Sequence, residues 1–198
     1  LEDPTQYIET CIKERLEQAE TRVLENNFYV LENNTNAIIY QGLKIPYLCK
    51  VSEFYVGCMP QEPMLFARAT NEIEAIITPQ VEACFDTLVG SYKKQNYEIE
   101  EGEMDLQVLI KKGKIQGFIE KKITLKKQET VINFNDFNRE LDSPLYDLID
   151  AARNIVNYES TFCEFNYINY MLYNPKIKIS KFSASDQTKI YTIKDRDT

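Results

Sequence analysis

The sequence predicts an α+β fold, in which an antiparallel β-meander packs against a helix pair linked by a disulfide. Two amphipathic patterns with helical period, over residues 4–25 and 71–92, predict the helix pair. Segments of strand character separated by short turns over residues 96–137 predict the meander, because strands joined by short turns pair antiparallel. A further helix pair and a C-terminal hairpin complete the expected architecture. A chain of 198 residues suits a single domain, so we expect one domain over residues 1–198.

Composition restricts the classes of function open to this chain. The net charge is −8 and the isoelectric point is about 4.8, so the surface repels nucleic-acid phosphates and anionic lipid heads. The chain has no histidine, which removes the commonest general base and metal ligand and excludes Ser-His-Asp and Cys-His catalysis. It also has no Cys-x-x-Cys pair for zinc. We therefore expect no enzymatic activity, no cofactor, no metal and no nucleic-acid partner.

The first helix is expected over residues 4–25. Asp3 followed by Pro4 is typical of a helix start, and a stripe of apolar residues begins at Ile8. The chain begins at Leu1-Glu2 without an initiator methionine. We expect either that a membrane anchor or signal has been removed before Leu1, or that these two residues are a cloning remnant.

Residues 28–40 are expected to form a hairpin, with strands at 28–31 and 37–40 and a turn at 33–36. Asn33 begins the tripeptide Asn-Asn-Thr, which is an N-glycosylation sequon at the exposed tip. Asn33 is therefore a glycosylation candidate, although such tripeptides often arise by chance.

Residues 41–66 show little regular pattern and are rich in tyrosine and proline. Loops carry function disproportionately, so this segment supplies the candidate binding surface. Its large apolar side chains are Tyr47, Phe54, Tyr55, Met59, Met64 and Phe66. The alternative, which we favour, is a loop that packs as a lid over one end of the sheet. Cys49 and Cys58 bracket eight residues, and a disulfide that closes this short loop is favoured over a metal pair because nothing nearby completes a metal site.

The central helix is expected over residues 71–92. Asn71 and Glu74 have the spacing of a capping box, Pro79 predicts a kink or break, and Gly90 predicts the end of the helix. Cys84 lies on the apolar stripe of this helix, and Cys11 lies on or beside the stripe of the first. Two helices packed by these stripes could bring the cysteines together. A disulfide between them is favoured over two separate buried cysteines.

The remaining segments complete the α+β pattern. The meander is expected to turn at residues 101–102, 111–114 and 128–129. A third helix is expected to begin at Asp142-Ser143-Pro144, and Thr161 and Glu164 are expected to cap a fourth. A hairpin is expected over residues 177–193. Cys163 has no evident partner among the five cysteines, so we expect it to be a buried free thiol.

The order of elements, with the motifs DPTQYIETC, VEAC and IYTIKD, resembles a group of exported, membrane-anchored proteins of unknown function from small-genome archaea. In that group a single N-terminal membrane helix precedes a first segment like DPTQYIETC. The resemblance covers most of the chain in layout. It implies an extracytoplasmic domain, a Cys11–Cys84 bridge and an anchor before Leu1, and it carries over no catalytic residue. Cys49, Cys58 and Cys163 lie outside the shared pattern.

Three hypotheses of function follow. The first is a non-enzymatic domain on the outer face of the cell envelope that binds a protein or envelope partner or assembles with itself, and that meets the membrane only through an N-terminal anchor. The second is a carboxylate-based hydrolase, which needs two acids in a cleft and no histidine; Glu98, Glu100 and Glu103 are its candidates. The third is a cytosolic adaptor with five reduced cysteines. We prefer the first hypothesis because the cysteines suit disulfides and no catalytic constellation is recognisable.

Overall fold

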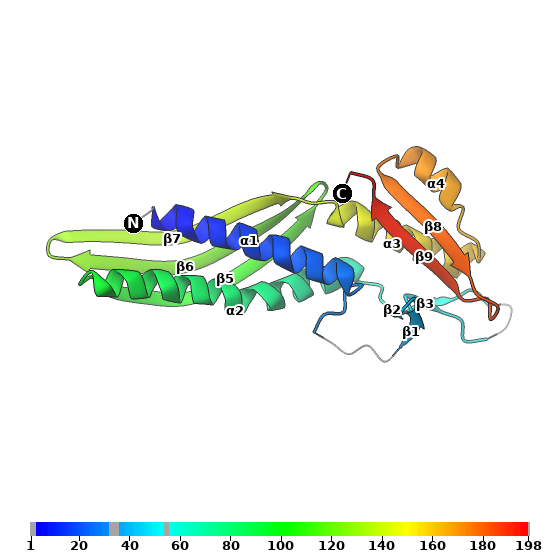
Figure 1. Cartoon of the computed structure of the whole chain (residues 1–198), viewed down its shortest axis with the longest axis horizontal. Helices are drawn as coiled ribbons and strands as arrows, with labels where there is room; N and C mark the ends of the chain where they lie inside the picture. The colour runs from blue at the N-terminus through cyan, green and yellow to red at the C-terminus, as the bar shows by residue number, and fades with distance from the viewer. Residues whose placement is uncertain (1–2, 32–35, 54–55, 198) are drawn as a thin grey trace. The chain divides into compact units, whose positions relative to one another are not determined.

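The computed structural model describes residues 3–31, 36–53 and 56–197. It confirms the α+β class, with antiparallel sheets and helices in the expected order (Figure 1). The chain divides into two compact units, each made of two segments. Unit 1 comprises Leu1–Asn33 and Ala67–Ser143, and unit 2 comprises Asn34–Phe66 and Pro144–Thr198. The single domain over residues 1–198 stays a prediction. Within the described ranges, no helix combines the length and apolar character needed to cross a membrane.

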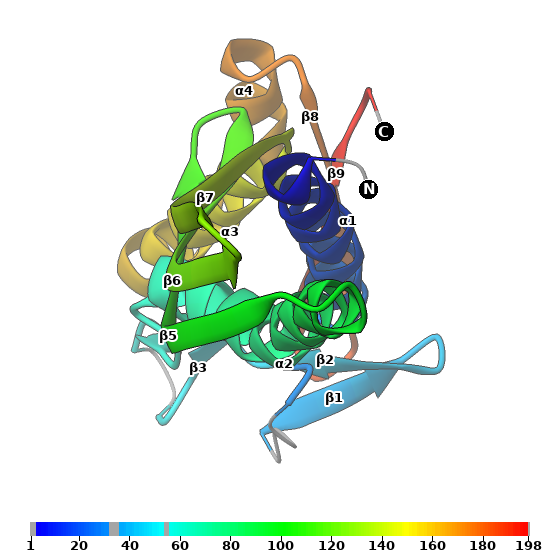
Figure 2. The same cartoon turned by 90° about the vertical axis from the view of Figure 1, so that its left-hand side faces the viewer.

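The described residues of unit 1 form two long helices and a three-stranded meander. The helices are α1 (Pro4–Glu25) and most of α2 (Leu65–Lys94), and the strands are β5 (Glu98–Lys111), β6 (Lys114–Lys127) and β7 (Thr130–Asp142). The strand order is β5-β6-β7, and every pairing is antiparallel. Figure 2 shows α1 beside β7 and α2 beside β5, so that the helix pair and the sheet enclose one interior. The predicted packing of the meander against the helix pair is therefore confirmed.

The interior of unit 1 is mainly aliphatic, and among its described residues three aromatic side chains, Phe85, Tyr92 and Phe137, are also buried. Apolar residues at helical spacing on α1 and α2 face alternate residues of the sheet, as burial on one face of each element requires. Phe85 of α2 and Phe137 of β7 pack edge to face, with ring centroids 5.2 Å apart. The largest fully buried side chains of this unit are Ile8, Ile12, Leu16, Ile73, Ile77, Phe85, Ile115, Ile119, Ile123, Leu125 and Phe137.

The start of α1 agrees with the sequence, whereas α2 differs from its prediction. The Asp3 side chain accepts a hydrogen bond from the Thr5 amide at 3.0 Å, so Asp3 is the N-cap. Helix α2 begins at Leu65 rather than at residue 71, continues through Pro79 without a break and ends at Lys94 rather than at Gly90. A proline removes only one intrahelical bond, and the flanking residues Ile76, Ile77 and Val81 are buried and hold the helix together.

Two carboxylates of α2 bind backbone amides outside their own helix. Glu74 does not close a capping box; it accepts a bond from the Val108 amide of β5 at 2.8 Å. Glu72 accepts bonds from the amides of Val30 and Leu31 at 3.2 and 3.0 Å. The predicted strand at residues 28–31 is therefore wrong, because these amides are bonded to a side chain instead of to a neighbouring strand.

Two of the predicted turns also differ from the structure. Strand β1 (Ala37–Tyr40) pairs with β2 (Leu43–Pro46), not with residues 28–31, and turns at Gln41-Gly42, where both residues have positive φ. Strand β5 does not turn at residues 101–102; it continues through a register shift between Glu101 and Met104. Asn33, the glycosylation candidate, lies outside the described residues.

The described residues of unit 2 form two helices and three small antiparallel sheets. The sheets pair β1 with β2, β3 (Cys49–Lys50) with β4 (Met59–Pro60), and β8 (Ile177–Ser183) with β9 (Lys189–Asp195). Helix α3 (Leu145–Phe162) contains Thr161, so Thr161 and Glu164 cannot cap the next helix. Helix α4 (Tyr167–Tyr173) is capped instead by the Asn166 side chain, which accepts a bond from the Asn169 amide. The core comprises Ala151, Ile155, Phe165, Ile177 and Ile179.

A glycine in β6 permits the close approach of α1. A β-carbon at Gly117 would lie 3.2 Å from Cγ2 of Ile12 and 3.3 Å from Cδ1 of Leu16, which is tighter than ordinary packing. We expect Gly117→Ala to lower the free energy of unfolding by about 1–2 kcal/mol, because both neighbours are fully buried and must shift. Urea denaturation followed by circular dichroism measures this change.

Gly90→Ala is the matched control for this prediction. Gly90 lies inside α2 and has open space where a β-carbon would stand. The substitution should therefore stabilise the chain by about 0.5–1 kcal/mol, through the higher helix propensity of alanine. Equal effects of the two substitutions would contradict the packing argument.

Candidate functional site

The chain has two disulfides, of which one links segments distant in the sequence and the other links neighbouring segments. Cys11 of α1 bonds to Cys84 of α2, with a Cα–Cα distance of 6.7 Å, and both residues are buried. Cys49 of β3 bonds to Cys58, next to β4, with a Cα–Cα distance of 5.4 Å, and both are half-buried. Disulfides form and persist in oxidising compartments. Two of them are therefore typical of a non-reducing, extracytoplasmic environment.

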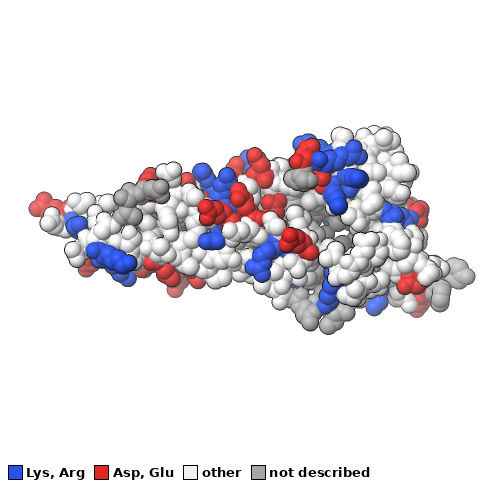
Figure 3. Space-filling model, in the orientation of Figure 1, with Lys and Arg blue, Asp and Glu red and all other residues white. Residues whose placement is uncertain are grey.

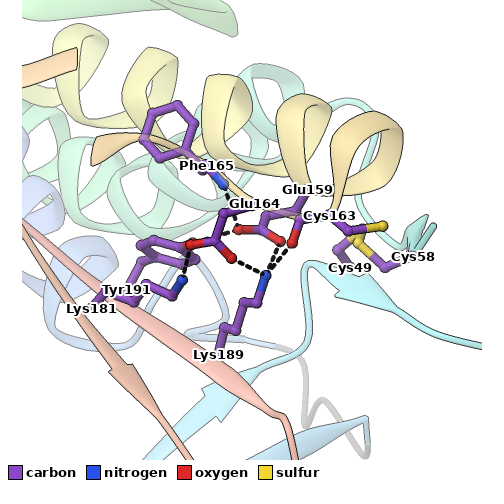
Figure 4. A network of polar contacts seen from close by, with 9 residues as sticks. All are labelled: Cys49, Cys58, Glu159, Cys163, Glu164, Phe165, Lys181, Lys189 and Tyr191. Carbon is purple, nitrogen blue, oxygen red and sulfur yellow. Dashed lines mark hydrogen bonds and ion pairs between the residues drawn. A yellow bond between two sulfur atoms is a disulfide. The ribbon is translucent and has the colours of Figure 1, made fainter. Parts of the chain in front are cut away.

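A buried carboxylate forms the centre of a polar network in unit 2 (Figure 4). Glu159, near the C-terminal end of α3, is only 8% exposed. Its Oε1 accepts bonds from the Phe165 amide at 3.0 Å and from the Tyr191 hydroxyl at 2.5 Å. Its Oε2 accepts a bond from Lys189 Nζ at 2.6 Å. Three donors, one from the segment after α3 and two from β9, therefore satisfy one carboxylate, as a buried charge requires.

The network continues to the surface through a second carboxylate. Glu164 accepts bonds from Lys181 at 2.5 Å and from Lys189 at 3.2 Å. Lys189 also donates to the carbonyl oxygen of Cys163. Both lysines belong to the β8–β9 hairpin, whereas both glutamates belong to α3 or the segment after it. These contacts attach the hairpin to the end of α3.

Electrostatics keep the central groups of this network in fixed protonation states. Burial acts to raise the pKa of Glu159, but the hydrogen bonds from Lys189, Tyr191 and the Phe165 amide outweigh it and hold that pKa below its ordinary value. Burial and the neighbouring Glu159 carboxylate raise the pKa of Tyr191 far above the ordinary value of a phenol. At neutral pH Glu159 is therefore ionised and Tyr191 is neutral, which suits a structural ion pair and not a proton-transfer pair.

Cys163 ends α3 and is an exposed free thiol, so the prediction of a buried thiol is wrong. The residue is the C-cap, with a left-handed φ of 59°, and its amide donates to the carbonyl of Glu159. A residue at this position has left the apolar stripe of the helix, and Phe165 fills the core instead. Figure 4 shows the Cys163 side chain directed toward the Cys49–Cys58 disulfide.

The predicted binding surface of residues 41–66 is only partly exposed. Met59 and Met64 are 61% and 66% exposed, and Tyr47 is half-buried. Phe66 serves packing within unit 2: its ring lies 5.0 Å from that of Tyr146, and the Arg153 guanidinium lies 5.4 Å from its centroid. Phe54 and Tyr55 lie outside the described residues.

A larger apolar surface lies at the end of α3 and on α4, outside the segment that the sequence singled out as a binding surface. Phe162 at the end of α3 is 65% exposed, and in α4 Ile168, Leu172 and Tyr173 are 60%, 74% and 80% exposed. Figure 3 shows acidic and basic side chains interspersed on the face drawn, with little charge over α4. The sequence could have indicated this exposed apolar surface, because α4 reads YINYMLY and carries no charged residue. A helix that is apolar over most of its surface needs cover on more than one side.

The carboxylates proposed for a hydrolase do not form an enclosed pair. Glu98, Glu100 and Glu103 are all exposed on β5. Glu100 accepts a bond from Lys126 at 2.5 Å, and this bond lowers the pKa of Glu100. Across the described residues, no group of three or more cysteines and carboxylates is placed to hold a metal ion. No protein-family model matches the chain, and no curated protein or solved structure matches it either.

Proposed function

We propose that this chain is a non-enzymatic domain of the cell envelope that binds protein on the outer face of the membrane, either a partner or a second copy of itself. The observation that carries the proposal is the apolar outer surface of α4 in unit 2. The two disulfides support an extracytoplasmic location. The resemblance to exported archaeal proteins implies the same location.

Helix α4 has two apolar sides that meet different surroundings. Tyr167, Tyr170 and Met171 pack against the core cluster of unit 2. Ile168 and Leu172, one turn apart on the same face, are exposed to solvent instead. A surface helix of a monomer normally presents polar residues to water. Exposed apolar patches mark sites of protein interaction, so this face is the expected contact.

Aromatic side chains extend the apolar character to the end of α3. The rings of Phe162 and Tyr158 are tilted by 46° with centroids 4.9 Å apart, and both side chains are exposed. Twelve of the fifteen exposed large apolar side chains among the described residues belong to unit 2. Aromatic residues in such clusters supply a large share of binding energy at protein interfaces. Unit 2 is therefore the binding part of the chain in this proposal.

The test compares the full chain with Ile168→Ser/Leu172→Ser and with the control Val131→Ser. Val131 is 55% exposed but belongs to β7 of unit 1. We expect the wild-type chain and the control to associate with rising concentration in sedimentation velocity, or to give a discrete adduct from a photocrosslinker at position 172 on intact cells. The double variant should do neither. A monomer at every concentration, together with no discrete adduct at position 172, would overturn the proposal.

A further inference from the structure

Three of the five cysteines gather at the C-terminal end of α3. Cys163 is the C-cap of that helix. Gly57, next to Cys58, packs against the same end, because a β-carbon at Gly57 would overlap the carbonyl of Ser160. Strands β3 and β4 also contact α3. The thiol and the disulfide therefore belong to one site, and in Figure 4 the thiol is directed toward the disulfide.

The two disulfides differ in their access to an attacking thiol. Cys11 and Cys84 are 6% and 8% exposed, whereas Cys49 and Cys58 are half-buried and Cys163 is exposed. Thiol–disulfide exchange requires access of a thiolate to one sulfur of the disulfide. The backbone of Cys163 is held in place, since its amide donates to the Glu159 carbonyl and its carbonyl accepts from Lys189. An exposed nucleophile on a held backbone thus lies at the same end of α3 as an accessible disulfide.

We propose that Cys49, Cys58 and Cys163 form a thiol–disulfide exchange site within one chain. The Cys163 thiolate attacks one sulfur of the Cys49–Cys58 bond, and a new bond forms between Cys163 and that sulfur. The old bond breaks, its electron pair stays on the departing cysteine, and solvent protonates the resulting thiolate. The step is redox-neutral and needs no oxidant, because one thiol and one disulfide are present before and after it. This site goes beyond the proposed binding function and does not depend on it.

Exchange would replace one local crosslink by another. In the starting state the disulfide closes the loop between β3 and β4, where Cys49 pairs with Pro60 and Lys50 with Met59. In the exchanged state one loop cysteine is tethered to the end of α3, and the other is a free thiol on the loop. The reactive thiol therefore moves from α3 to the segment of residues 49–58.

Peptide mapping of the full chain, purified without reductant, tests this exchange. Trypsin places the three cysteines on separate peptides, 45–50, 51–68 and 154–176, because Lys44, Lys50 and Arg153 supply the cleavage sites. Samples incubated at a series of pH values are blocked with N-ethylmaleimide before digestion. We expect peptide 154–176 linked to 45–50 or 51–68 in monomeric protein, with label on the remaining loop cysteine. Its rate of formation should rise with pH, because the thiolate and not the thiol is the attacking species.

Two controls separate local exchange from other routes. Cys163→Ser should give only the link between 45–50 and 51–68, with no maleimide label. Peptides 1–13 and 69–93, which carry Cys11 and Cys84, should stay linked to each other throughout. The proposal is overturned if all the label stays on Cys163 at every pH, if Cys163 links only between two chains, or if it links as readily to 1–13 or 69–93.

Discussion

Replacing both Cys11 and Cys84 by alanine is expected to lower the free energy of unfolding by about 4 kcal/mol. This disulfide joins residues 73 apart in the sequence, so its loss releases a large loop in the unfolded chain. It also removes the covalent link between α1 and α2, which enclose the core of unit 1 with the meander. Thermal unfolding followed by circular dichroism should show a melting temperature lower by about 10 °C.

The matched control is Cys49→Ala/Cys58→Ala. Its cysteines are only 9 residues apart, so the same entropic argument gives a loss of about 2.5 kcal/mol. The effect should also be confined to probes in unit 2, which contains this loop. A control variant that loses as much stability as the first, or more, would contradict the argument from loop length.

Glu159→Gln is expected to destabilise unit 2 by about 2 kcal/mol at neutral pH. The substitution keeps the shape of the side chain but removes the charge that accepts bonds from Lys189, Tyr191 and the Phe165 amide. Hydrogen bonds to a charged group each contribute about 1.5–3 kcal/mol, and the amide retains part of this bonding. Hydrogen exchange of residues 177–195, with urea denaturation, measures how firmly the β8–β9 hairpin is held.

The same variant should change the dependence of stability on pH. The pKa of Glu159 is lower in the folded chain than in the unfolded chain, so its contribution is fully present above the unfolded pKa of about 4.3. It is lost as pH falls through the lower folded pKa. The difference between wild type and Glu159→Gln should therefore shrink in acid. A difference that stays constant from neutral pH to acid would show that the charge of Glu159 is not responsible.

Glu164→Gln is the matched control, because it removes a carboxylate charge from the same network at an exposed position. Glu164 binds the lysines of the same hairpin, but its side chain is 67% exposed. Exposed ion pairs contribute little because water and salt screen them, so we expect a loss of less than about 1 kcal/mol. High salt should weaken the effect of Glu164→Gln further and leave that of Glu159→Gln largely unchanged.

The local sequence pattern was sufficient to predict several helices and strands and part of the candidate site. The bounds of α1 follow from Asp3, Pro4 and an apolar stripe, since a helix start and its period are encoded within a few residues. The meander and the C-terminal hairpin follow from the alternation of apolar and polar residues and from the short turns between strands. The Cys11–Cys84 bond was expected from two cysteines on or beside helix stripes, because stripes that pack together bring their members close.

The bonding partners of polar side chains were decided by the tertiary structure. Glu74 has the spacing of a capping box but binds the amide of Val108, 34 residues away. Glu72 binds the amides at residues 30 and 31, and so replaces a strand that the local residues favour. Glu159 accepts bonds from the segment after α3 and from β9, and no short motif in the sequence predicts these partners. A carboxylate binds whichever donors the packed chain brings to it, so its partners cannot be read from neighbouring residues.

The sequence by itself thus determined the class of fold, the positions of most elements and the cysteines that face one another across the helix pair. Only the tertiary structure decided that Cys163 is exposed beside a second disulfide and that α4 is apolar on its outer side. The physical reason is that periodicity records which residues avoid water. Segments distant in the sequence decide by their packing whether a given apolar face is buried. The same packing decides which thiol lies near which disulfide.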